Sequence, residues 1–295
     1  MLANVNKADI ILASQPASQP ASQPASQPAS QPASQPASHS LKPIIRWCGG
    51  KSKLATSIIN KFPQHTCYVE PFCGGAAVFL KKQRSHCEVI NDINGELVNL
   101  YRCIQHHPEE IAKQSALMLH SRELFLNHQE SALQTLTDIQ RAARFYALQR
   151  MAFGGKVSGQ SFGYARTAKA GLSSKRFERD VALLTERLNG VFIENTHWLD
   201  CIKRYDSGGT LVFCDPPYWN TAGYGVDFGF ENYENMAEIM RSMKGKMIVT
   251  VNDIPEMSEC FSEFSIEQLE ITYTLGKVKD GKRAGKSCEL LIKNY

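Results

Sequence analysis

Residues 211–219 read LVFCDPPYW, and this stretch predicts a buried β-strand that ends at Asp215. The run LVFC contains no polar residue, which is typical of a strand inside a parallel sheet. Pro216 and Pro217 follow Asp215 directly, and because proline fixes its φ angle and has no amide hydrogen, the strand ends there. An acidic side chain therefore stands at the carboxyl end of a strand, which is where open α/β sheets bind their ligands.

Six further segments have the composition of strands, and helix-like segments separate most of them. This alternation favours an α/β fold with a largely parallel sheet. The last two candidates are joined by GKVKDGKRAGKS without a helix, so we expect them to form an antiparallel hairpin. The strand candidates are residues 67–72, 87–92, 190–195, 210–215, 246–252, 266–275 and 288–295.

The middle of the chain has a different pattern. Long helical periodicities such as QRAARFYALQRMAF, residues 140–153, are followed by the glycine-rich stretch GGKVSGQSFGYARTAKAG. We interpret residues 101–189 as a separate, mainly helical domain. The α/β core then consists of residues 41–100 and 190–295, with the helical domain inserted between its two parts.

The composition excludes several classes of protein. The nine cysteines include no Cys-x-x-Cys pair, which favours reduced thiols in the cytoplasm over a disulfide framework or a zinc site. No stretch approaches the roughly 18 consecutive apolar residues of a membrane span, so we expect no membrane partner. The net charge of +4 permits a nucleic-acid partner without demanding one. The sequence leaves the oligomeric state open.

Residues 1–40 form a predicted disordered leader. From Ser14 to Ala37 the chain repeats Ser-Gln-Pro-Ala, which cannot bury a core and favours extended, solvated backbone. One interpretation is a simple spacer. A second comes from the genetic code: tandem AGCC encodes Ser, Gln, Pro and Ala in that order, so gain or loss of one unit would shift the frame and switch expression, as in phase variation. A gene without tandem AGCC would contradict this hypothesis.

The residues after the strand at 211–214 form a chemically distinctive cluster. The two prolines remove amide donors, so nearby carbonyl oxygens face outward as acceptors beside the Asp215 carboxylate and the Tyr218 ring. Such a cluster suits a ligand that presents an amino group and an aromatic face, as a nucleobase does. An ordinary Pro-Pro turn with a packed tyrosine remains the alternative.

Four motifs, in this order, resemble those of a known family: RWCGGKSKL at 46–54, YVEPFCGGAAVFL at 68–80, INDIN at 90–94 and DPPY at 215–218. The chain is similar to the Dam-like DNA adenine methyltransferases over most of its length after residue 40. The resemblance implies a Rossmann-like S-adenosylmethionine-dependent methyltransferase sheet with helices on both faces. It also implies that the helical insertion recognises the target DNA.

The resemblance implies a set of cofactor-binding residues. An indole can pack on a thioether or on adenine, a lysine can pair with the methionine carboxylate, and an acid at a strand end can bind ribose hydroxyls. The sequence departs from the family pattern Phe-x-Gly-x-Gly, because it has Gly75 and then Ala76 where the second glycine is expected. The residues assigned to S-adenosylmethionine are Trp47, Lys51, Phe72, Gly74, Asp92 and Asp215, with Glu70 and Pro71 in the same motif.

The resemblance also assigns the chemistry. Asp215, Pro216 and Tyr218 are the expected catalytic residues: the carboxylate and the Pro216 carbonyl accept hydrogen bonds from the adenine amino group, and Tyr218 stacks on the extruded base. Trp219 either extends that wall or packs in the core. The family's cytosine amino methyltransferases carry Ser in place of Asp, so Asp215 favours adenine. The mechanism requires no metal.

We expect double-stranded DNA as the partner, read by the insertion. Basic and polar residues there suit phosphates and base edges: Arg150, Lys156, Gln160, Tyr164 and Arg166, with Arg141, Arg144, Ser161, Lys169, Lys175 and Arg176 around them. A solvated helical face is the alternative for any one of them. The Arg-Tyr-Asn stretch of enzymes that read GATC is missing, so the target sequence stays open. The loop with Lys277, Lys279, Lys282, Arg283 and Lys286 is a second phosphate-contact candidate.

The sequence also contains part of a phosphate-loop pattern. GGKS ending at Ser52 resembles part of a phosphate loop, but the required first glycine falls on Ile45, which cannot supply that turn. An ATPase is therefore disfavoured. We expect a site-specific enzyme that methylates N6 of adenine in duplex DNA. An RNA or relaxed-specificity adenine methyltransferase and a non-catalytic DNA-binding module remain alternatives.

Overall fold

The computed structural model describes residues 41–164, 166–167, 169–221, 228–271 and 287–295. These residues fall in one compact unit, Ser40–Tyr295. The predicted leader, residues 1–40, and the predicted basic loop with Lys277 to Lys286 lie outside the described residues. No helix in the described ranges has the length and apolar character needed to cross a membrane.

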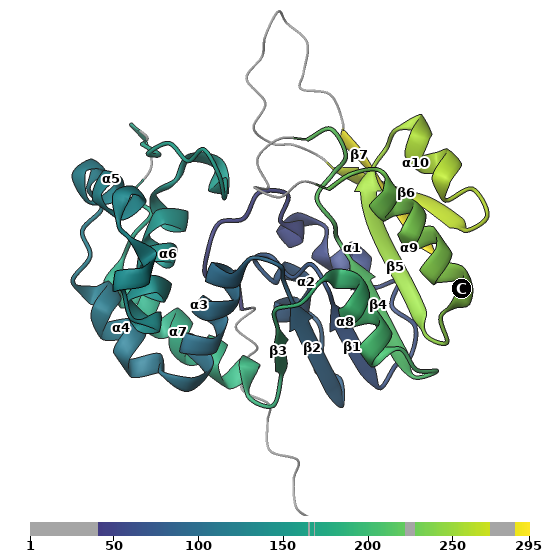
Figure 1. Cartoon of the computed structure of the whole chain (residues 1–295), viewed down its shortest axis with the longest axis horizontal. Coiled ribbons are helices and arrows are strands. Elements are labelled where there is room, and N and C mark those ends of the chain that lie inside the picture. Colours follow the sequence, from purple (N-terminus) through teal and green to yellow (C-terminus); the bar gives the residue numbers. More distant parts are fainter. Residues whose placement is uncertain (1–40, 165, 168, 222–227, 272–286) are drawn as a thin grey trace, which may run out of the picture. The chain divides into compact units, whose positions relative to one another are not determined.

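A seven-stranded sheet forms the centre of the unit, in the order β3-β2-β1-β4-β5-β7-β6 (Figure 1). Every strand coincides with one of the sequence predictions, and most of them contain an apolar run closed by a turn or a polar residue. β3 is the shortest, with three residues. The strands are β1 Cys67–Glu70, β2 Cys87–Asn91, β3 Phe192–Glu194, β4 Thr210–Cys214, β5 Lys246–Asn252, β6 Ser265–Ile271 and β7 Ser287–Lys293.

Six strands run in the same direction, and β7 alone runs against them. β1 pairs in parallel with both β2 and β4, and β4 pairs in parallel with β5. β7 lies between β5 and β6 and is antiparallel to both. The predicted hairpin of the last two strands is therefore confirmed.

Helices cover both faces of the sheet, as predicted. Successive side chains of a strand point to opposite faces, so Tyr68 packs into one core cluster and Val69 into the other. The first cluster also holds side chains of α1 (Ala55–Ile59), α2 (Ala77–Lys81), α3 (Gly95–His106) and α7 (Ser174–Leu188). The second holds those of α8 (Trp198–Tyr205), α9 (Glu231–Ser242) and α10 (Pro255–Cys260).

The chain between β2 and β3 is helical, and Figure 1 shows its helices gathered beside the β3 edge. α6 begins with a capping box in which Thr137 and Gln140 bind each other's backbone amides. The predicted boundary at residue 101 falls inside α3, whose apolar face packs into the first core cluster. The insertion's limits stay a prediction. Its remaining helices are α4 Pro108–Ala116, α5 Arg122–Glu130 and α6 Asp138–Met151.

A buried ion cluster ties the last helix of this region to the sheet. Arg187 of α7 donates to both carboxylate oxygens of Glu88 in β2, and Lys82 also pairs with that carboxylate. The Arg187 guanidinium also stacks 3.7 Å from the centroid of the Phe79 ring. Buried ions are stable only when paired and hydrogen-bonded, so these contacts fix α7 against β2.

Candidate active site

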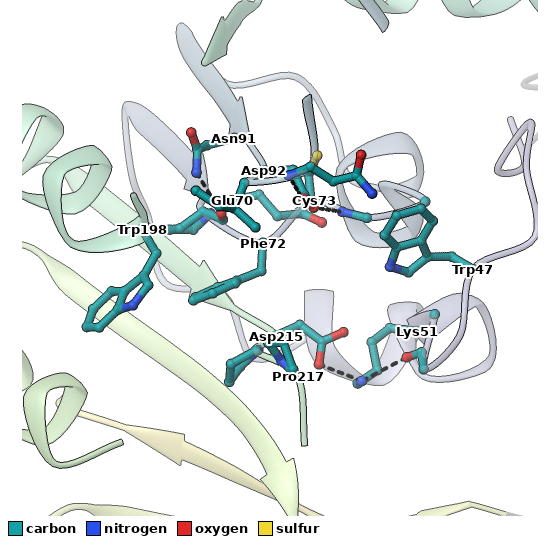
Figure 2. A pocket seen from close by; sticks show the side chains of 18 of the residues that line it. Trp47, Lys51, Glu70, Phe72, Cys73, Asn91, Asp92, Trp198, Asp215 and Pro217 are labelled. Carbon is teal, nitrogen blue, oxygen red and sulfur yellow. Dashed lines mark hydrogen bonds and ion pairs between the residues drawn. The ribbon is translucent and has the colours of Figure 1, made fainter. Parts of the chain in front are cut away.

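The sheet reverses its winding between β1 and β4. The chain leaves β1 toward β2 and leaves β4 toward β5, which opens a crevice at the carboxyl ends of the two adjacent strands. A cavity of about 320 Å³ lies there. The cofactor residues predicted from sequence all line it: Trp47, Lys51, Phe72, Gly74, Asp92 and Asp215 (Figure 2).

Asp215 stands just past the end of β4 and is held by two donors. Lys51 Nζ lies 2.5 Å from Asp215 Oδ1, and the Thr250 hydroxyl donates to the same oxygen at 2.8 Å. Burial raises the pKa of Asp215, while the Lys51 ammonium and the Thr250 hydroxyl oppose that rise. The sequence predicted a cofactor carboxylate as the partner of Lys51; in the structure Lys51 is only 4% exposed and pairs with Asp215.

The rest of the Asp-Pro-Pro-Tyr motif presents one acceptor and one ring. The Tyr233 hydroxyl donates to the Pro217 carbonyl. Pro216 also lines the cavity, and no backbone donor in the described part of the chain bonds to its carbonyl oxygen. Tyr218 does not line that cavity; Lys51 Nζ lies over its ring, 4.7 Å from the centroid.

Asp92 follows β2 and faces the cavity from the opposite side to Asp215 (Figure 2). The backbone amides of Gly74 and Asn94 donate to its two carboxylate oxygens at 3.0 and 2.9 Å. Burial raises the pKa of Asp92 to about 6, against the lowering effect of these amides. A carboxylate oxygen with one donor keeps a second lone pair, so Asp92 can still accept a hydroxyl group.

The glycine loop after β1 passes directly beneath the Trp47 indole. A Cβ atom on Gly74 would lie 2.4 Å from Trp47 Nε1, and Gly74 has a φ of +45°. Ala76 occupies the place of the family's second glycine and still adopts the left-handed conformation, with φ 54° and ψ 35°. The backbone at Ala76 thus has a left-handed conformation typical of glycine, which costs an alanine about 1 kcal/mol.

Glu70 ends β1 inside the same cavity, and its carboxylate is buried. The Tyr68 hydroxyl and the Phe79 amide donate to Glu70 Oε2 at 2.7 and 3.1 Å. Burial raises the pKa of Glu70 to about 8, and the nearby Asp215 charge adds to the rise. Glu70 therefore carries a proton at neutral pH.

Sequence reasoning predicted Phe72 as a cofactor-binding residue but missed two other aromatic residues of the cavity wall, Trp198 and Phe228. The Phe72 ring lies 6.1 Å from that of Trp198 and meets the Phe228 ring edge-on at 5.6 Å. Trp198 begins α8, just after the end of β3. Its place just after a strand end, where α/β sheets bind their ligands, is the sequence signal that could have indicated it.

Glu289 was also missed. It lies on β7 opposite Asn252 of β5, and its Oε2 atom is 3.8 Å from Lys51 Nζ. Burial raises the pKa of Glu289, and Lys51 lowers it. Because it belongs to an antiparallel strand far along the chain, no local pattern indicated its place beside Lys51.

Four of the five predicted DNA-binding residues lie in the connection between α6 and α7, Arg150 lies in α6, and all five stand outside the cavity. Lys156, Tyr164 and Arg166 are exposed, and the Gln160 amide donates to the Lys156 carbonyl at 2.7 Å. Arg150 differs, because it is half-buried and its Nε donates to the Gly171 carbonyl at 2.9 Å. No group of three or more His, Cys, Asp or Glu side chains in the described ranges is arranged to hold a metal ion.

The fold and the cavity define an α/β enzyme with a ligand site at its switch point. The chain belongs to the D12 class N6 adenine-specific DNA methyltransferase family, whose profile matches residues 47–275. It is therefore an adenine-specific DNA methyltransferase that uses a methyl donor, and the family, fold class and enzyme class predicted from sequence are confirmed.

Individual relatives are similar at modest identity. The Type II methyltransferase M1.LlaDCHI of Lactococcus lactis subsp. cremoris is 26% identical over 280 residues, which cover 87% of this chain and 96% of that protein. The DNA adenine methylase of Escherichia coli (strain K12) is 25% identical, over 68% of this chain and 76% of that protein. The DNA N-6-adenine-methyltransferase of Escherichia phage P1 is 26% identical, and the match covers 77% of this chain but 32% of that longer protein.

Proposed function

We propose that the protein transfers the methyl group of S-adenosylmethionine to N6 of adenine at specific sites in duplex DNA, in the cytoplasm. The single observation that carries this proposal is that Asp215 and Asp92 face the same cavity from two strand ends (Figure 2). One acid would hold the reacting amino group, and the other would hold the ribose of the methyl donor.

The residues present fit S-adenosylmethionine. The hydrogen-bonded Asp92 carboxylate suits ribose hydroxyls, and the missing side chain of Gly74 lets a ligand approach the backbone beside Trp47. Phe72 and Trp198 offer apolar faces to an adenine ring. S-adenosylmethionine supplies a methyl group on positively charged sulfur; the protein supplies orientation and electrostatics.

Adenine's amino nitrogen is a weak nucleophile because its lone pair is delocalised into the ring. Hydrogen bonds from the amino group to the Asp215 carboxylate and the Pro216 carbonyl would localise that pair and direct it out of the ring plane. Because burial raises the pKa of Asp215, its carboxylate is a stronger base than an exposed aspartate and can take the proton that the nitrogen releases.

The base must leave the duplex to reach this cavity. Tyr218 is the proposed stacking partner of the base, and Lys51 Nζ lies over its ring. Site recognition is assigned to the inserted helices and to Arg150, Lys156, Gln160, Tyr164 and Arg166. The target sequence is left open.

The test is methyl transfer from labelled S-adenosylmethionine to duplex DNA, single-stranded DNA and RNA, followed by mapping of the methylated adenines. We expect N6-methyladenine in duplex DNA within one sequence context, and its loss in Asp215→Asn. Asp200→Asn, an exposed acid of α8, is the matched control. Methylation of RNA alone, methylation without sequence context, or DNA binding without turnover would each contradict the proposal.

A further inference from the structure

A second cavity of about 650 Å³ lies beside the first and is lined by cations. Its lining includes Lys42, Arg46, Lys81, Arg150 and Arg176 and contains no acidic residue. The whole chain has a net charge of only +4. Positive charge is thus concentrated here, and we call this hollow the basic cavity.

Four different parts of the chain bring these cations together. Lys42 and Arg46 precede the first helix, Lys81 ends α2, and the other two belong to α6 and α7. The segment at Arg46 is fastened to the α6–α7 connection, because the Cys48 amide donates to the Gly155 carbonyl at 3.2 Å. The convergence is therefore a product of the fold and has no counterpart in a local sequence run.

The guanidinium groups lie close enough to repel one another. Burial, followed by the charges of Arg176 and Arg46, lowers the pKa of Arg150. Asp180 lies outside the lining and pairs with Arg176 at 3.3 Å. Gathering like charges costs free energy unless an anion compensates it, so the arrangement is that of a site for a strongly anionic ligand.

The basic cavity shares a wall with the proposed methyl-transfer cavity. Trp47, Gly50, Gly75 and Ala77 line both hollows. A ligand in the basic cavity would therefore lie on the far side of the Trp47 segment from Asp215 and Asp92. A base that swings out of a duplex remains attached to its own backbone, which must pass close to the reacting cavity.

We propose that the basic cavity binds phosphates of the DNA strand next to the extruded adenine. A planar guanidinium group donates two parallel hydrogen bonds to one phosphate, and a lysine ammonium adds a single positive charge. The five positive charges exceed the single negative charge of a methyl donor's carboxylate. Successive phosphates of a DNA strand carry several negative charges and therefore fit the basic cavity better. Contacts of this kind position the strand without reading its sequence. The inference rests on the proposed function, since it takes DNA as the substrate.

The experiment compares the full chain with the double variant Lys81→Gln/Arg176→Gln. Both side chains are exposed, and neither is assigned to the catalytic cavity. The matched control is Lys113→Gln/Lys203→Gln, which removes two exposed lysines outside the basic cavity. Affinity for a fluorescent duplex is measured by anisotropy over a range of salt concentrations, and affinity for S-adenosylmethionine by calorimetry.

We expect the double variant to bind duplex DNA about tenfold more weakly than the wild type. The slope of its affinity against salt concentration should correspond to about two fewer ions released on binding. Its affinity for S-adenosylmethionine should equal that of the wild type. DNA affinity and salt slope equal to those of the control would overturn the inference. Weaker S-adenosylmethionine binding with unchanged DNA binding would also overturn it, by assigning the cavity to the methyl donor's carboxylate. A wild type that binds DNA through these cations but does not methylate it would refute the proposed function and leave this inference standing.

Discussion

Lys51 Nζ lies 2.5 Å from Asp215 Oδ1, and the lysine that makes this contact is buried. The ion pair joins the segment before α1 to the end of β4. It also places the ammonium over the Tyr218 ring and 3.8 Å from Glu289. The charge state of Asp215 therefore depends on a residue that sequence reasoning had assigned to the cofactor.

Replacing Lys51 with methionine should shift the pH dependence of methylation. Burial already raises the pKa of Asp215, and Lys51 opposes that rise, so its removal raises the pKa further. A larger fraction of Asp215 is then protonated at any given pH. When the pH is lowered, the variant therefore loses activity at a higher pH than the wild type does. We expect kcat at pH 7 to drop roughly tenfold and to recover partly at higher pH.

The measurement is kcat and KM between pH 6 and 9, with Lys53→Gln as the control from the same turn. If the variant loses activity at the same acidic pH as the wild type and only its KM is raised, Lys51 binds the cofactor instead of controlling the charge of Asp215.

Glu70→Gln should flatten the dependence of stability on pH. The pKa of Glu70 is raised by burial from 4.5 to about 8, so the folded protein holds a proton that the unfolded chain releases. Stability then falls as pH rises from about 5 to 8, by on the order of 1 kcal/mol per pH unit at most. The glutamine carbonyl oxygen can accept from Tyr68 and Phe79 without ionising.

Urea denaturation at pH 6 and pH 9 checks this. The wild type should lose more free energy of unfolding across that interval than Glu70→Gln does, and the other ionisations cancel in the comparison. Equal losses in the two proteins would show that Glu70 is ionised in the folded state.

Gly74→Ala should displace Trp47 and weaken binding of the methyl donor. The new Cβ atom would lie 2.4 Å from Trp47 Nε1, at a φ of +45° that alanine rarely adopts. We expect a changed tryptophan fluorescence spectrum and at least about tenfold weaker S-adenosylmethionine binding, with about 1 kcal/mol of backbone strain. Gly208→Ala is the control, because nothing lies within 4 Å of its added carbon. An unchanged affinity would remove Trp47 from the proposed donor site.

Arg187→Met should destabilise the protein by about 3 kcal/mol, because it leaves a buried carboxylate short of one partner. Burial raises the pKa of Glu88, but hydrogen bonds from Arg187 and Lys82 outweigh it and hold the pKa below its usual value. That stabilisation exists above the unfolded pKa and is lost as pH falls. The free energy of unfolding at pH 7 is compared with that of Arg179→Met, an exposed arginine of the same helix. Equal effects would show that the ion cluster does not hold α7 in place.

Most of the strands were predictable because they contain an apolar run that ends at a turn or a polar residue; β6, with the sequence SIEQLEI, alternates apolar and polar residues instead. LVFC before Asp215 and CEVIN before Asp92 illustrate such runs, and the strand-end rule then placed both acids at one ligand site. The resemblance to the family added Trp47 and Gly74, whose contact depends on a backbone path that periodicity does not describe.

The contacts that sequence reasoning missed depend on residues brought together only in three dimensions. Glu289 reaches Lys51 because β7 inserts beside β5. Arg150 is turned toward the Gly171 carbonyl, so its basic character alone did not reveal that part of its hydrogen-bonding capacity is already used. The roles assigned to the individual site residues stay predictions.

The order of the last three strands has a consequence for synthesis on the ribosome. β5 and β6 do not pair with each other; both pair with β7, which is made after them. Until residues 287–293 emerge, a growing chain carries two strand edges with unmatched amides and carbonyls, which favour sticking to other chains. Pausing of translation shortly before that segment should therefore promote aggregation, and chaperones that shield bare strand edges should matter most at that stage.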